Sequence, residues 1–113
     1  ASRASRQRCR AAARGLGQLR LETLAPLERQ ATRQRCLEAL EAGAADGEWV
    51  VRYAVVVGLE RLALPESAAP SERLASSNRI RSCLTGLASD THEDTPVVRL
   101  RATQALHRLD HHD

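Results

Sequence analysis

Residues 47–62 of this chain read GEWVVRYAVVVGLERL, and residues 94–109 read DTPVVRLRATQALHRL. The two stretches share a Val-Val-Arg core, which places Arg99 47 residues after Arg52. A repeat that is longer than one helix and has a period of about 40–47 residues is typical of stacked helix pairs. The sequence therefore predicts an all-α fold in which neighbouring pairs bury a continuous core between them.

The repeat extends upstream of these two stretches, and this sets the expected boundaries of its units. Two units of helix pairs are predicted, over about residues 24–63 and 71–110. With one further helix before them, the expected architecture is an α-α superhelix of about five helices, a HEAT-like or armadillo-like solenoid. The chain, residues 1–113, is expected to form a single domain or a piece of a longer solenoid. The upstream positions that repeat are Leu27 and Leu74, Cys36 and Cys83, Leu37 and Leu84, and Leu40 and Leu87.

Turn residues and prolines give the helix boundaries. The predicted helices run from about Ser5 to Gln18, from near Pro26 until Gly43–Gly47 end the helix, from about Glu48 to Ala63, from about Ser71 through Leu87, and over residues 96–109. The helix from Glu48 is apolar almost all round, so it is expected to be the most buried element. Asp94 or Thr95 is expected to cap the last helix through its side chain. An arginine one turn into such a helix can then reach an acid of the adjacent loop and lock one repeat to the next.

Charge is distributed unevenly along the chain. All 17 basic residues are arginines, and residues 1–35 carry a balance of +7 against −4 for residues 36–113. The positive segment suits an anionic partner, or equally a solvated helix face. It lacks interleaved aromatic residues and a recognition-helix pattern, which argues against nucleic acid. No apolar run approaches the roughly 18 residues of a membrane span, so none is expected.

Cysteine and histidine patterns do not indicate a metal site or a disulfide framework. The three cysteines are Cys9, Cys36 and Cys83. They form no Cys-x-x-Cys pair, so a reducing compartment is expected, with Cys36 and Cys83 as small packing residues. His107 and His111 have helical i, i+4 spacing, and His92 precedes an acid, but too few further ligands accompany them. No metal is therefore expected.

The string from Trp49 to Leu59, WVVRYAVVVGL, follows Asp46, and a poorer copy follows Asp94. This pattern resembles the HEAT-like repeats of the phycobilin lyase family, the E/F-type lyases. The resemblance implies a subunit of a bilin lyase. Such a subunit binds a linear tetrapyrrole of the phycocyanobilin type as substrate, holds no permanent cofactor, and assists attachment of the bilin to a phycobiliprotein cysteine.

The resemblance also implies partners and a location. The partners are a second HEAT-like lyase subunit and the acceptor phycobiliprotein, in the cytoplasm near phycobilisomes. The acceptor cysteine would supply the thiolate, so the lyase would act by holding and orienting the bilin, and no catalytic residue is assigned. Two alternatives stay open: a non-catalytic HEAT-repeat scaffold for protein–protein interaction, and a protein of phycobilisome degradation or chromophore handling.

Helical spacing provides candidate bilin-binding residues. Arginine forks bind carboxylates such as propionates in a bidentate manner, and flat aromatic rings suit pyrroles. The alternative for the same residues is structural: arginines that link the repeats, and aromatic rings in the core. An exposed Trp49 with free arginines would favour a ligand surface, whereas a buried Trp49 with Arg52 and Arg99 tied to loop acids would favour a scaffold. The candidates are Trp49, Arg52, Tyr53, Arg99 and Thr103.

Overall fold

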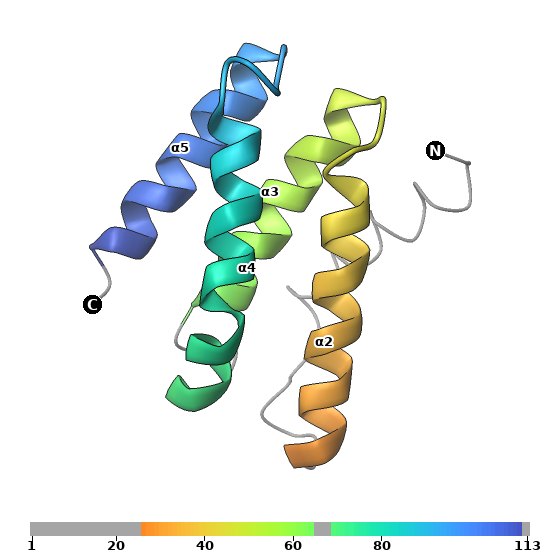
Figure 1. Cartoon of the computed structure of the whole chain (residues 1–113), viewed down its shortest axis with the longest axis vertical. Coiled ribbons are helices and arrows are strands. Elements are labelled where there is room, and N and C mark those ends of the chain that lie inside the picture. The colour runs from red at the N-terminus through yellow and green to blue at the C-terminus, as the bar shows by residue number, and fades with distance from the viewer. Residues whose placement is uncertain (1–25, 65–68, 112–113) are drawn as a thin grey trace.

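The computed structural model describes residues 26–64 and 69–111, which form four helices (Figure 1). The helices are α2 (Pro26–Gly43), α3 (Trp49–Ala63), α4 (Pro70–Ala88) and α5 (Pro96–Asp110). These residues contain no strand, so the all-α prediction is confirmed. The helix predicted over Ser5–Gln18 lies outside the described residues, and superhelical stacking stays a prediction.

Prolines mark three of the helix starts, at Pro26, Pro70 and Pro96. Pro70 and Pro96 stand at the first turns of α4 and α5, where the missing N–H costs nothing. The predicted capping of α5 is wrong. Thr95 occupies the N-cap position with φ −97° and ψ 113°, but its side chain accepts no hydrogen bond from the free backbone N–H groups of the first turn. The two side chains are instead turned toward Arg52, whose Nη2 donates to Asp94 Oδ1 at 3.3 Å and to Thr95 Oγ1 at 3.2 Å.

The helices form two hairpins that stand side by side. α2 pairs with α3, α4 pairs with α5, and α3 also packs against α4 and α5. In Figure 1, α3 lies behind α4, with α2 on one side and α5 on the other. α3 and α5 both run away from the end of the molecule where the loops 44–48 and 89–95 lie. Equivalent helices of the two repeats are therefore neighbours in space.

The apolar core runs between the hairpins, and α3 lies at its centre. Val55, Val56 and Leu59 of α3 are 0% exposed, which confirms the prediction that this helix is the most buried. Cys36 and Cys83 pack against the core while staying partly exposed. Burial raises the pKa of Cys83 to about 11, which fits the predicted packing role. The rest of the core comprises Leu37, Leu40, Leu62, Ile80, Leu84, Leu87, Val98, Ala102, Ala105 and Leu109.

Polar contacts join α2 to α4. Arg29 Nη2 donates to Glu72 Oε1 at 3.0 Å, and Arg33 Nη2 donates to Ser76 Oγ at 2.9 Å. These two members of the basic N-terminal segment therefore take part in contacts between repeats, while residues 1–25 of that segment lie outside the described residues. Within the described ranges, no helix is long and apolar enough to cross a membrane.

Candidate functional site

Arg52 joins the two hairpins at their loop end. Its Nε donates to both carboxylate oxygens of Glu93, at 2.5 and 2.8 Å, and its Nη1 donates to the Asp46 carbonyl oxygen at 2.8 Å. The side chains of Arg52 and Glu93 are 13% and 2% exposed. The pair is thus nearly dehydrated, and Arg52 is a strut between repeats, as the structural alternative expects.

The loop acid that binds Arg52 most closely is Glu93. Asp94, the acid of the same loop that the sequence predicts as a helix cap, binds less closely: its side chain is 94% exposed and its Oδ1 lies 3.3 Å from Arg52 Nη2. The signal for Glu93 is its position, 47 residues after Asp46. Both acids are buried, and the arginine six residues later donates to the carbonyl oxygen of each. Arg99 makes this second contact, at 2.7 Å to Glu93.

Apolar side chains are exposed where α3 and α5 begin. We call the surface formed by Trp49, Val50, Tyr53, Val97 and Leu100 the α3–α5 face. Trp49 and Leu100 are 47% and 59% exposed, and Val50 and Val97 are exposed to similar extents. Tyr53 is half-buried against the core one turn after Trp49. Exposed large apolar side chains on two helices that pack together are candidates for a surface that binds a partner or ligand.

A carboxylate and two arginines bridge α3 to α5 beside this face. Arg101 donates to Glu60 from Nη1 at 2.7 Å and from Nη2 at 3.3 Å, and Arg108 Nη1 donates to Glu60 Oε1 at 2.9 Å. Burial of Glu60 raises its pKa, but the hydrogen bonds and charges of both arginines outweigh burial, so the pKa lies below its usual range. Hydrogen bonding to Glu60 raises the pKa of Arg101, with a smaller contribution from Tyr53.

The structure divides the five predicted site residues between different places. Trp49 and Tyr53 lie on the α3–α5 face, whereas Arg52 is held by Glu93. Arg99 binds a loop carbonyl, and Thr103 Oγ1 donates to the Arg99 carbonyl oxygen at 2.9 Å. At about 100° per residue, Arg99 and Thr103 lie on the other flank of α5 from Arg101. Bilin contact by any of the five stays a prediction.

Arg101 and Arg108 are not among the sequence candidates, although the sequence contains a signal for them. They are seven residues apart, which places them on one side of a helix. Their common partner, Glu60, is 41 residues from Arg101 and 48 from Arg108, so only the packing of α5 on α3 brings the three together.

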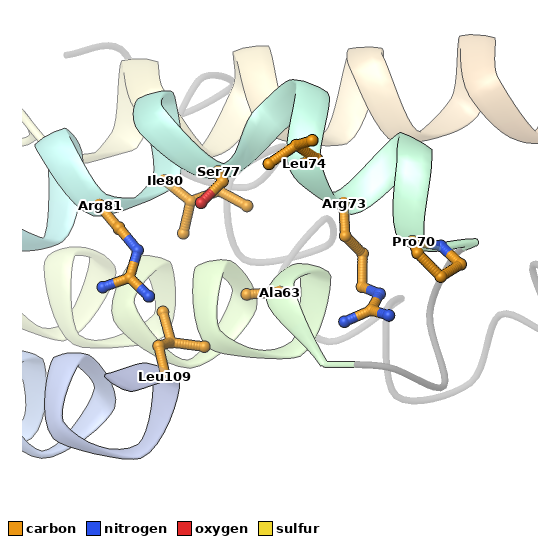
Figure 2. Close-up of a pocket in the computed structure, with 8 residues that line it drawn as sticks. All are labelled: Ala63, Pro70, Arg73, Leu74, Ser77, Ile80, Arg81 and Leu109. Carbon is orange, nitrogen blue, oxygen red and sulfur yellow. The ribbon is translucent and has the colours of Figure 1, made fainter. Parts of the chain in front are cut away.

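A hollow of about 340 Å³ opens among α3, α4 and α5 (Figure 2). In Figure 2, Arg73 and Arg81 extend from α4 in the same direction, toward α3 and α5. Arg81 Nη1 donates to Asp110 Oδ1 at 2.5 Å. No predicted site residue lines the hollow, and none of its described lining residues is a cysteine, histidine or acid. The lining residues are Ala63, Pro70, Arg73, Leu74, Ser77, Ile80, Arg81 and Leu109.

The histidines near the end of α5 do not complete a metal site with the other described residues. The ring centroids of His107 and His111 lie 4.2 Å apart. Across residues 26–64 and 69–111, no group of three or more histidine, cysteine or acidic side chains is placed to hold a metal ion.

Known proteins resemble this chain in sequence. Over 102 residues, or 88% of the chain, it is 43% identical to a bilin biosynthesis protein, RpcF, of Synechococcus sp.. Over 55 residues it is 51% identical to the phycocyanin alpha phycocyanobilin lyase CpcF of Synechocystis sp. and 47% identical to a phycobilisome maturation protein of Synechococcus elongatus. No protein-family model and no solved structure matches the chain.

The chain spans less than half the length of these relatives: the matches cover 43%, 25% and 27% of the three proteins. The first match nevertheless covers almost all of this chain, and the names of all three relatives concern bilins or phycobilisomes. The four described helices, with a Val-Val-Arg string at the start of α3 and of α5, agree with the resemblance seen in the sequence. In sequence, the chain is therefore similar to proteins of the phycobilin lyase family.

Proposed function

We propose that this protein is a subunit of a bilin lyase, which binds a linear tetrapyrrole of the phycocyanobilin type and assists its attachment to a phycobiliprotein cysteine. The observation that carries the proposal is the 43% identity to a bilin biosynthesis protein over 88% of this chain. A second relative is named a phycocyanobilin lyase for phycocyanin alpha, which supports the bilin and the phycobiliprotein as substrates. The interaction-scaffold alternative has no comparable support among the relatives.

The α3–α5 face is the surface that we assign to the bilin. It presents an exposed indole at Trp49 and an exposed aliphatic side chain at Leu100, which suit the flat apolar rings of a tetrapyrrole. Tyr53 extends the aromatic surface by one helical turn. Arg52 is bound to Glu93, and we therefore assign it to the scaffold that positions this face.

The chemistry divides between the lyase and its acceptor. The thiolate belongs to the acceptor cysteine, so this chain contributes orientation, by holding the bilin where the cysteine can reach it. A second HEAT-like subunit would cover the rest of the tetrapyrrole, and the reaction would take place in the cytoplasm near phycobilisomes. Bilin held in one conformation gives a single adduct, whereas free bilin can react in several orientations.

Titration of the purified protein with phycocyanobilin tests this proposal. The bilin absorption bands and the emission of Trp49, the one tryptophan of the chain, report binding. Leu100→Ser is expected to weaken binding about tenfold, since burying a leucine contributes about 1.5–3 kcal/mol and tenfold corresponds to about 1.4 kcal/mol. Leu27→Ser is the matched control, because Leu27 is 81% exposed on α2, away from the face.

Two outcomes would contradict the proposal. A titration without saturable spectral change would refute bilin binding by this protein. Equal weakening by Leu100→Ser and Leu27→Ser would refute the assignment to the α3–α5 face. If binding follows the expected pattern, bilin transfer to an apo-phycobiliprotein in the presence of a partner lyase subunit tests the second half of the proposal.

A further inference from the structure

Arg108 has unused hydrogen-bonding capacity beside the α3–α5 face. Its Nη1 donates to Glu60 Oε1 at 2.9 Å, and Glu60 is its one ion-pair partner among the described residues. The Arg108 side chain is 57% exposed, and neither its Nε nor its Nη2 makes a hydrogen bond to a described residue. Arg101 is only 16% exposed, and both of its terminal nitrogens donate to Glu60. Of the two guanidinium groups, that of Arg108 is therefore the more accessible to a ligand.

Glu60 fixes the position of both guanidinium groups but balances only one of their two positive charges. The cluster holds two guanidinium groups and one carboxylate, so it retains a net positive charge. Glu60 is 8% exposed, and its hydrogen bonds restrict the rotamers of both arginines before any ligand arrives. Such a positioned fork is suited to bind a carboxylate by charge-assisted hydrogen bonds.

The two halves of the repeat show that this cation cluster is specific to the α3–α5 junction. Arg61 occupies the repeat position equivalent to that of Arg108, since the two are 47 residues apart. Arg61 is exposed on α3 and has no ion pair with the other described residues. Arg108 instead reaches across to the neighbouring helix.

Along α5, the apolar and cationic parts of this surface follow one another on one flank. Val97 is four residues before Arg101, and Arg108 follows seven residues later. At about 1.5 Å per residue, the axial distance from Val97 to Arg108 is about 16 Å. A ligand that covers this flank needs an apolar part against Val97 and an anionic group that reaches Arg108. A linear tetrapyrrole with propionate side chains has this chemistry.

We propose that Arg108, positioned together with Arg101 by Glu60, is the carboxylate-binding group that anchors a bilin propionate on the α3–α5 face. The inference rests on the proposed function, because it names the polar contact of that same site. It assigns to Arg108 and Arg101 the propionate contact that the sequence alone suggests for Arg52 and Arg99.

The test compares phycocyanobilin with its dimethyl ester, which has the same rings and lacks the free carboxylates. Arg108→Gln is expected to weaken binding of the free acid about three- to fivefold, because an exposed ion pair is lost. Binding of the ester is expected to be equal in the wild type and in Arg108→Gln. The matched control is Arg61→Gln, which removes the same charge at the equivalent repeat position and should leave both affinities unchanged.

The outcomes separate this inference from the proposed function. Saturable binding of the free acid that Arg108→Gln leaves unchanged would overturn the inference while the proposed function stands. Equal weakening of acid and ester by Arg108→Gln would also overturn it, because the effect would then be structural and not ionic. Absence of binding of either compound to the wild type would refute both. Thermal unfolding of each variant verifies that the fold is intact.

Discussion

Truncation of Arg52 to alanine is expected to cost much of the stability of this domain. The change leaves the Glu93 carboxylate, which is 2% exposed, without its cation, and leaves the Asp46 carbonyl oxygen without the donor at 2.8 Å. Removing one partner of a buried ion pair costs about 3–5 kcal/mol. Because the Arg52 side chain keeps 13% exposure, we expect the lower end of that range, about 3 kcal/mol. Small domains have only about 5–15 kcal/mol in total.

Urea unfolding followed by circular dichroism measures the free-energy difference. Arg99→Ala is the matched control, because Arg99 makes the equivalent backbone contact, at 2.7 Å, without an ion pair to a described carboxylate. It is expected to cost about 1 kcal/mol, the net value of one hydrogen bond. The double variant Arg52→Met, Glu93→Met should recover most of the loss, since it removes the buried charge together with its partner. Equal losses for the two single alanine variants, with no recovery in the double variant, would refute the argument.

Three further predictions concern the core, the ion cluster and a thiol. Leu59→Ala, at a side chain that is 0% exposed, should cost about 2–5 kcal/mol in urea unfolding, whereas Leu27→Ala, at 81% exposure, should stay within about 0.5 kcal/mol. The pKa of Glu60 is lower in the folded protein than in the unfolded chain, so its stabilisation is complete above about pH 4.3 and is lost as the pH falls through the lower folded value. Wild type and Glu60→Gln should therefore differ in stability at neutral pH and converge in acid; a constant difference would contradict this. Cys83, with a pKa of about 11, should react with iodoacetamide at pH 8 on the order of 100-fold more slowly in the folded than in the unfolded protein, and comparable rates by mass spectrometry would contradict its burial.

The positions of the four described helices are predictable from the sequence because short sequence patterns mark where each helix begins. Prolines at 26, 70 and 96 stand at three helix starts, and the Val-Val-Arg string opens both α3 and α5. Apolar spacing was enough to identify α3 as the central helix. The link from Arg52 to the next loop was also predictable, because a repeated arginine beside a repeated acid has few other structural uses.

Which charged residues meet beside the α3–α5 face depends on contacts between distant parts of the chain, and short sequence patterns do not predict such contacts. Glu60 meets Arg108 across 48 residues, and their contact is set by how far α5 is shifted along α3. A shift by one turn would bring a different side chain opposite Glu60. The sequence therefore indicates arginines suited to bind carboxylates, but which arginines lie beside the α3–α5 face depends on the packing of the two helices.

The buried carboxylate of Glu93 has a consequence for how helix pairs of this kind are assembled. An apolar interface between α3 and α5 alone would tolerate small slides, because leucine and valine side chains can repack in more than one register. Glu93 is paired only where Arg52 stands opposite it, and a slide of one turn, about 5.4 Å, would leave a nearly fully buried charge without a partner. The Arg52–Glu93 ion pair therefore favours a single register of α5 along α3. It also gives the stack a direction, because the arginine of one unit pairs with the acid of the unit that follows it in the chain.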